Sequence, residues 1–228
     1  MDVLRRLDRA RSATNVLEHP FYERWVAGGL TAGELSVYAG EYRHAVVALA
    51  EASAKAAAMA PAEYRSGLER HAEEERSHVA LWDQFARAAQ AQPAAGEHGG
   101  SGPVRASEHV AGAQTEACTR AWTAGTDALE SLAVLYAIEA SQPEIAKTKL
   151  DGLVGHYGYA PEGPAVEYFE LHRRLDVEHA RQAAELIERL LEDCEDREAA
   201  YERMVTRAQA ALEGNWLLLS GVEALTGC

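Results

Sequence analysis

The sequence predicts an all-α protein, a single-domain helical bundle of seven to eight helices. Helix-favouring Ala, Leu, Glu and Arg dominate the 228 residues, whereas only three Phe occur and β-branched runs are scarce. The hydrophobic content of 47% is enough for one substantial core. No repeat period divides the chain, so residues 1–228 are expected to form one domain.

Start and stop signals define the helical segments. The predicted helices cover residues 2–13, 20–27, 31–58, 61–91, 107–123, 126–154, 163–193 and 196–225. Pro20 is tolerated in the first turn of its helix, and Gly28-Gly29 ends that helix. Thr31 and Glu34 have the spacing of a capping box, which starts the next helix. Pro61 starts the one after it.

Interruptions are expected at three places in the second half of the chain. Residues from about 92 to 106 are rich in turn-forming types, so they predict a flexible surface loop rather than a domain boundary, because neither flank alone makes a core. Pro143 lies inside the 126–154 helix and is expected to kink it, since its ring clashes with the carbonyl of residue 139. The stretch 155–163 separates this helix from the next.

Charge and composition exclude several partners. The formal net charge of −14 argues against a nucleic acid or an anionic membrane surface as partner. There is no apolar window of about twenty residues for a membrane span, and the first residues lack the apolar run of a signal peptide. Cys118, Cys194 and Cys228 are odd in number and irregularly spaced, which suits a reducing cytoplasm. We therefore expect a cytoplasmic protein, with a homodimer as a further possibility.

The segment from residue 172 to residue 179 carries a possible half of a metal site. His172, Asp176 and His179 are separated by four and three residues, so all three lie on one helical face. Two imidazoles and a carboxylate on one stripe can bind a transition metal if the stripe faces a core. Other helices must then supply further ligands.

Two other predicted helices carry candidate ligands. In the 61–91 helix, Glu75 lies three residues and Glu74 four residues before His78, and His71 lies one turn further back. Glu139 lies inside the apolar run from Leu132 to residue 140. Burying that carboxylate uncompensated costs several kcal/mol, so it must be protonated, paired or bound to a metal.

Together these helices offer mixed imidazole and carboxylate ligands without a thiolate. The set is His78, His172, His179, Glu139, Asp176 and either Glu75 or Glu74. Such ligands suit iron or manganese better than structural zinc, and six of them fit two metals bridged by a carboxylate. Each motif alone also has an ordinary explanation as a solvated acidic face, surface histidines or a salt-bridged buried acid. Their convergence favours the metal interpretation.

With these residues in view, the sequence resembles the haem-oxygenase-like di-metal oxidases, helical relatives of the TenA and PqqC proteins, over nearly the whole chain. It resembles in particular the group that includes the chlamydial death-domain-associating protein. The members of this group are self-sacrificing para-aminobenzoate synthases. The matching segments are Leu17–Tyr22 with Trp25, His78–Phe85, Leu135–Glu139 with Pro143 and Lys149, and His172-x3-Asp176-x2-His179. The last of these motifs is the most specific.

The resemblance implies a role for each matching residue. It makes His78, Glu139, His172, Asp176 and His179 metal ligands. Tyr22 falls where that group has the tyrosine that is cut into the aromatic product. Tyr38 matches a second tyrosine near the site, and Lys149 matches the lysine implicated in supplying the amino group.

The chain departs from the group at two positions. His71 stands where the group has its first glutamate ligand, so Glu75, Glu74 or His71 itself could complete the site. We prefer Glu75, because alkene-forming relatives have a Glu three residues before the corresponding His. Ile138 stands where the group has another tyrosine.

Three functions are compatible with the sequence. The leading hypothesis is an oxidase with two metal ions, an iron pair or iron and manganese, that uses O2 and an external reductant to convert its own Tyr22. The second places the same metals on an external small molecule, such as an amino acid or fatty acid, for N-oxygenation, desaturation or C–C cleavage. The third is a helical module that binds a pyrimidine-like or cofactor ligand, although Cys118 and Cys194 fall in no TenA-type nucleophile motif.

Overall fold

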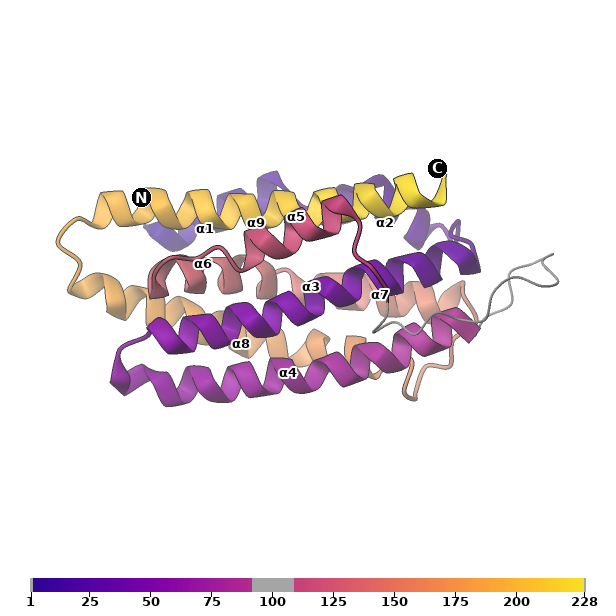
Figure 1. Cartoon of the computed structure of the whole chain (residues 1–228), viewed down its shortest axis with the longest axis horizontal. Coiled ribbons are helices and arrows are strands. Elements are labelled where there is room, and N and C mark those ends of the chain that lie inside the picture. Colours follow the sequence, from indigo (N-terminus) through magenta and orange to yellow (C-terminus); the bar gives the residue numbers. More distant parts are fainter. Residues whose placement is uncertain (1, 92–108, 228) are drawn as a thin grey trace.

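The computed structural model describes residues 2–91 and 109–227, and within these ranges every regular element is a helix (Figure 1). The α-helices are α1 (Val3–Ala13), α2 (Pro20–Val26), α3 (Ala32–Met59), α4 (Ala62–Ala91), α5 (Ala113–Trp122), α6 (Ala128–Glu139), α7 (Gln142–Gly155), α8 (Glu167–Glu192) and α9 (Arg197–Thr226), with a short 3-10 helix, η1 (Val16–Glu18), before α2. The all-α prediction is confirmed. The loop expected at about 92–106 lies outside the described residues.

The helix α6 occupies the middle of the bundle. It packs against α3, α8 and α9, while α3 packs along α4 and α5 packs along α9 (Figure 1). Nine of its residues are buried, including Leu132, Leu135 and Glu139. A helix that is apolar on all sides is stable only inside a core, so this sequence pattern predicts its central place.

The predicted capping box at the start of α3 is present. The backbone N–H of Glu34 donates to Thr31 Oγ1 at 3.2 Å, and the backbone N–H of Thr31 donates to Glu34 Oε2 at 2.7 Å. Each bond pairs a backbone N–H group at the N-terminus of α3 that has no acceptor within the helix. These bonds fix where α3 begins.

The segment 126–154 is two helices rather than the single kinked helix that the sequence predicts. α6 ends at Glu139, and α7 begins at Gln142 with Pro143 in its first turn. Proline has no N–H to donate and clashes with the preceding turn, so the chain breaks instead of bending. As a result Glu139 terminates one helix, and Lys149 lies on another that packs against α8.

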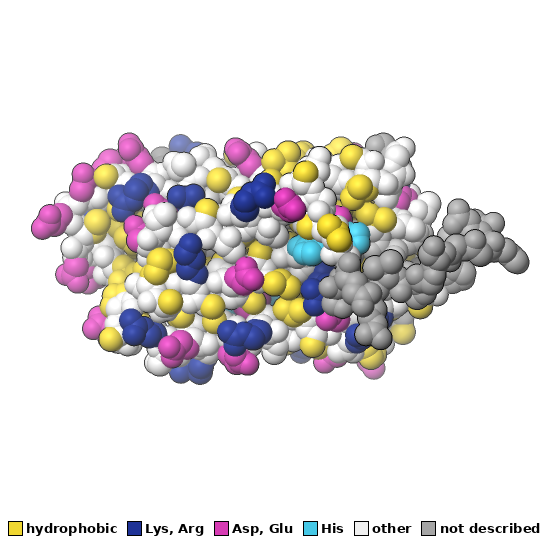
Figure 2. All heavy atoms as spheres, viewed as in Figure 1, with side chains coloured by type: hydrophobic (Ala, Val, Ile, Leu, Met, Phe, Trp, Pro, Cys, Tyr) yellow, Lys and Arg dark blue, Asp and Glu magenta, His cyan; other side chains and the backbone are white. Residues whose placement is uncertain are grey.

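On the face seen in Figure 2, basic and acidic side chains are interspersed rather than gathered into patches of one sign. Within the described part of the chain, no helix combines the length and the apolar character needed to cross a bilayer.

A close contact between Trp25 and Gly152 docks α2 on α7. Trp25 is fully buried, and its indole N–H donates to the backbone oxygen of Lys149 at 3.2 Å. A Cβ atom added at Gly152 would lie 2.3 Å from the Trp25 indole nitrogen, so only glycine leaves room for the ring. This contact fixes the position of the α7 turn that carries Lys149.

Replacing Gly152 by Ala is expected to lower the free energy of unfolding by about 1–3 kcal/mol, because the added methyl group overpacks the Trp25 contact. Urea denaturation followed by circular dichroism measures the change. Gly155→Ala is the matched control on the same helix, since nothing lies within 4 Å of a Cβ there. Equal stability of the two variants would contradict the proposed docking contact.

Candidate metal centre

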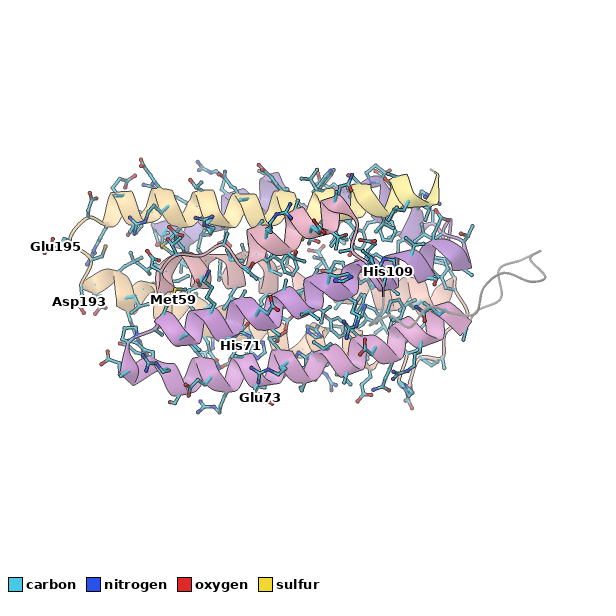
Figure 3. The ribbon with its side chains drawn as sticks, in the orientation of Figure 1. Met59, His71, Glu73, His109, Asp193 and Glu195 are labelled. Carbon is cyan, nitrogen blue, oxygen red and sulfur yellow. The ribbon has the colours of Figure 1, made fainter. Side chains whose placement is uncertain are left out.

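Three helices bring the candidate ligands together in the interior. α4 contributes His71, Glu75 and His78, α6 contributes Glu139, and α8 contributes His172, Asp176 and His179. None of these residues is more than 8% exposed. Figure 3 shows His71 on the inner side of α4 and Glu73 on its outer side. All six ligands predicted from sequence therefore lie in one buried cluster, together with His71.

The cluster consists of two groups that share one carboxylate. His71, Glu75, Glu139 and His179 form the first group, and Glu75, His78 and His172 form the second, with the ligand atoms of each group within 4.8 Å of one another. Membership of both groups is what a carboxylate bridging two ions requires. Asp176 belongs to neither group, but its Oδ1 lies 3.7 Å from His179 Nδ1.

The sequence left three candidates for the ligand from α4, namely Glu74, Glu75 and His71, and the structure places them differently. Glu75 is 99% buried at the centre, and His71 Nε2 lies 2.9 Å from Glu139 Oε1. Glu74 has a side chain that is 53% exposed, and its Oε2 is hydrogen-bonded to His179 Nε2 at 3.2 Å. The geometry favours Glu75 and His71 as ligand positions and leaves Glu74 outside the centre. The resemblance does not carry His71 over as a ligand, although it lies one turn before Glu75.

Outer hydrogen bonds orient two of the imidazoles. His172 Nδ1 is hydrogen-bonded to the backbone oxygen of Tyr168 at 2.8 Å, so its Nε2 faces the centre. The bond between Glu74 and His179 Nε2 likewise leaves His179 Nδ1 facing inward. Metal-binding histidines commonly have such partners on the nitrogen that does not bind the metal, because the partner fixes the ring and its tautomer.

The inward-facing atoms of the cluster form no well-aligned hydrogen bonds within the described residues. They are His71 Nε2, both oxygens of Glu75, His78 Nδ1, both oxygens of Glu139, His172 Nε2, both oxygens of Asp176 and His179 Nδ1. Two close imidazole–carboxylate contacts remain, His71 Nε2 to Glu139 Oε1 at 2.9 Å and His78 Nδ1 to Glu75 Oε1 at 3.2 Å. Most of the other atoms are buried without a partner that replaces their lost hydration, which is costly. A divalent cation removes this cost, so the residues present fit bound metal.

The cluster perturbs the pKa values of its members in opposite directions. Burial raises the pKa of Glu139, and the nearby charges of Glu75 and Asp176 raise it further despite the opposing effect of His71. Burial also disfavours the charged form of Glu75, but His172 and His78 outweigh it and bring its pKa well below the usual range. A cation near these carboxylates would favour their charged forms.

A group of aromatic side chains adjoins the second ligand group. The Tyr168 ring stacks on His172 with 3.9 Å between ring centroids, and the Trp82 ring lies 4.9 Å from Tyr168. Tyr22 is 1% exposed and Tyr38 is fully buried. Burial raises the pKa of both hydroxyls well above the ordinary value for tyrosine, and the neighbouring Tyr42 raises both further. Both tyrosines therefore stay protonated at neutral pH.

Lys149 lies among these rings instead of at the surface. It is 1% exposed, and its Nζ lies 4.2 Å from the centroid of the Tyr42 ring and 5.4 Å from that of Tyr38. No ion pair to Lys149 occurs within the described ranges, and burial lowers its pKa to about 7. A large fraction of this amine is therefore uncharged at neutral pH.

Some residues of this region were not singled out in the sequence. Tyr168 precedes His172 by one helical turn, and Tyr42 follows Tyr38 by one turn, so both share a face with a residue of interest. This one-turn spacing is the sequence feature that would have identified both tyrosines as neighbours of the site. His19 has a structural role instead, because its Nδ1 accepts a hydrogen bond from the Phe21 backbone N–H and caps the helix that carries Tyr22.

The fold and this buried cluster of histidines and carboxylates define a class of metal-dependent oxidoreductase. A sequence model for iron-containing redox enzymes matches residues 37–212, which is most of the chain. The chain therefore belongs to this family of iron-containing redox enzymes.

Comparison with individual proteins gives a finer result. The chain is 32% identical to the 4-aminobenzoate synthase of Chlamydia muridarum over 215 residues, covering 91% of this chain and 87% of that protein. It is 28% identical to the 4-aminobenzoate synthase of Nitrosomonas europaea over 233 residues, covering 95% of this chain and 89% of that protein. 4-Aminobenzoate is the para-aminobenzoate of the sequence-based hypothesis.

Solved structures confirm the expected haem-oxygenase-like fold. A Shewanella denitrificans domain of unknown function with that fold superposes with a TM-score of 0.79 at 18% identity, covering 100% of this chain and 94% of the other. The TenA homologue from P. horikoshii superposes with a TM-score of 0.74 at 16% identity and covers 100% of both chains. At these identities the similarity shows the fold alone.

Glu75→Gln is expected to abolish the stabilisation of the protein by ferrous or manganous ions, because the shared carboxylate is lost from both groups. For the unaltered protein, a metal present at a hundred times its Kd adds about 2.7 kcal/mol to the free energy of unfolding. Anaerobic thermal unfolding with and without metal measures the difference. Glu74→Gln is the matched control and should retain most of the stabilisation; the reverse ranking would show that Glu74 is the ligand.

Metal affinity should rise with pH up to about 9. Burial opposes protonation of His179, but Asp176, Glu139 and Glu75 outweigh it and raise its pKa to about 9, so the imidazole carries a proton at neutral pH. Metal binding must displace that proton. The affinity should then increase about tenfold per pH unit for one proton released. Titration calorimetry in buffers of different ionisation enthalpy counts the protons, and a flat affinity from neutral pH upward would contradict this account.

Proposed function

We propose that this protein is a 4-aminobenzoate synthase that converts its own Tyr22 at a centre of two metal ions, an iron pair or iron and manganese. The observation that carries the proposal is the Lys149 amine, buried among phenols that adjoin the candidate metal centre, with a pKa lowered by burial to about 7. The similarity to 4-aminobenzoate synthases over nine tenths of the chain supports the same activity.

The residues fall into two sets that would hold the ions. His71, Glu75, Glu139 and His179 would hold one, and Glu75, His78 and His172 would hold the other. Asp176 belongs to neither group but acts on the pKa of both His172 and His179, so it could serve either ion. When bound, such ions supply electrons to dioxygen and stabilise the reduced oxygen. An external electron donor would keep them reduced, and we expect the reaction to take place in the cytoplasm.

The side chains around Tyr22 prepare it for reaction. Burial excludes water from the Tyr22 ring and keeps its hydroxyl protonated. Tyr38 is close enough to Tyr22 for the two phenols to shift the pKa of one another, and its ring centroid lies 5.4 Å from Lys149 Nζ. An uncharged amine is the nucleophilic form of lysine, and no prior proton loss is needed for that fraction of molecules.

The atoms of the product account for which bonds of Tyr22 must change. Its ring and Cβ correspond to the ring and carboxyl carbon of 4-aminobenzoate, so the Cα–Cβ bond breaks. Cβ is oxidised from a methylene to a carboxyl group by one dioxygen, which supplies both carboxyl oxygens, and Cα is left as the methylene of a glycine residue. The Lys149 nitrogen bonds to the ring carbon that carries the phenolic oxygen, and that oxygen leaves as water. The Lys149 Cε–Nζ bond then breaks as Cε is oxidised to an aldehyde. A second dioxygen accepts these two electrons together with two from the external donor. The protein is thereby consumed as a substrate.

Tyr22→Phe is expected to abolish 4-aminobenzoate formation, because the ring then lacks the oxygen that the nitrogen replaces. The variant keeps the aromatic packing, so it should fold. Product is measured by chromatography after aerobic reaction of metal-loaded protein with a reductant. Tyr201→Phe, which alters a ring that packs under Arg6, is the matched control and should keep full activity.

Mass spectrometry of the reacted protein distinguishes self-conversion from an external substrate. Under the proposal, Tyr22 loses its side chain beyond Cα, and protein made with nitrogen-labelled lysine yields labelled product. An intact Tyr22 after many turnovers, with an added amino acid or fatty acid consumed, would establish the external-substrate alternative instead.

A further inference from the structure

A cavity between α4, α6 and α8 reaches the candidate metal centre from the surface. Its volume is about 310 Å³, and His71 and His179 line its inner part. Both belong to the first ligand group. His71 lies on the inner side of α4 (Figure 3), so the cavity approaches the ligand cluster between this helix and α8.

The cavity is lined by exposed charged side chains and by buried side chains. Its outer wall includes the exposed residues Glu63, Arg70, Glu185 and Arg189, whose two positive and two negative charges balance. Its inner wall includes Leu132 and Leu135 of α6, which are fully buried. Balanced charges select for neither anions nor cations, whereas the buried leucines beside the two histidines favour a small uncharged molecule.

The cavity and the reacting tyrosine approach different halves of the cluster. The cavity contacts the first ligand group through His71 and His179. The aromatic side chains contact the second group, where Tyr168 stacks on His172. A molecule in the cavity therefore reaches the centre without passing Tyr22, Tyr38 or Lys149, none of which lines the cavity.

We propose that this cavity is the path by which dioxygen reaches the metal centre. Dioxygen is small, uncharged and apolar, as the inner wall requires. The inference rests on the proposed function only in that it takes dioxygen as the oxidant. Gly67 of α4 lines this path and has room for a larger side chain, so a bulky residue there should narrow the path.

Gly67 allows the path to be blocked without disturbing the core. Gly67 is exposed, and a Cβ atom there would contact only Arg70 Nη2, at the ordinary distance of 3.9 Å. Gly67→Trp places a large ring at the cavity. Gly67→Ala is the matched control for the loss of glycine, and Glu69→Trp places the same ring at an exposed position of α4 that does not line the cavity.

Two measurements test the proposal. In crystals pressurised with xenon, which occupies apolar cavities, a xenon atom should lie against Leu132 and Leu135 in the unaltered protein and be absent from Gly67→Trp. In single-turnover mixing of reduced, metal-loaded protein with dissolved dioxygen, Gly67→Trp should react several-fold more slowly than Gly67→Ala and Glu69→Trp. The metal content of each variant, measured first, makes the rates comparable.

The outcomes separate this inference from the proposed function. If Gly67→Trp slows dioxygen uptake but no variant forms 4-aminobenzoate, the access path stands and the proposed function fails. If 4-aminobenzoate forms and Gly67→Trp reacts as fast as Gly67→Ala, the access path is overturned and the proposed function stands. Absence of xenon from the cavity of the unaltered protein would also overturn the path.

Discussion

The burial of three carboxylates and four imidazoles in one cluster, with few well-aligned hydrogen bonds to their inward atoms, is the constraint on which the rest of this structure depends. Glu75, Glu139 and Asp176 repel one another and lose their hydration, so the cluster opposes folding unless cations or protons balance it. Apolar packing around α6 must offset that cost in the metal-free chain. Bound metal would turn the same cluster into a stabilising interaction between three helices, which couples the assembly of the site to the stability of the bundle.

The sequence predicted the parts of this cluster that depend on local spacing. His172, Asp176 and His179 share one face of any helix that contains them, and Glu139 is conspicuous inside an apolar run. The choice between Glu74 and Glu75 could not be made in the same way. Adjacent residues differ by about 100° around a helix axis, and which of them faces inward is decided by how α4 packs on its neighbours.

The burial of Lys149 depends on tertiary contacts that local sequence patterns do not predict. Its sequence context is that of an ordinary solvated lysine, and the expected kink near Pro143 does not by itself predict burial. The structure buries it through two tertiary features: the complete break between α6 and α7, and the docking of Trp25 against Gly152. Aromatic faces then surround the amine in place of water or a counter-ion, which accounts for its lowered pKa.

The substrate of the proposed reaction is also a structural residue, and this limits how the protein can work. Tyr22 is 1% exposed and packs against Phe21 and Trp25, the ring that docks α2 on α7. Removing a buried aromatic side chain typically costs about 3–5 kcal/mol, a large fraction of the stability of a domain. A chain that has lost its Tyr22 ring would therefore keep less packing at the helix contact that positions Lys149. Conversion of Tyr22 both uses up the substrate and weakens the structure that presents the amine, so a single turnover per chain is the physically consistent outcome.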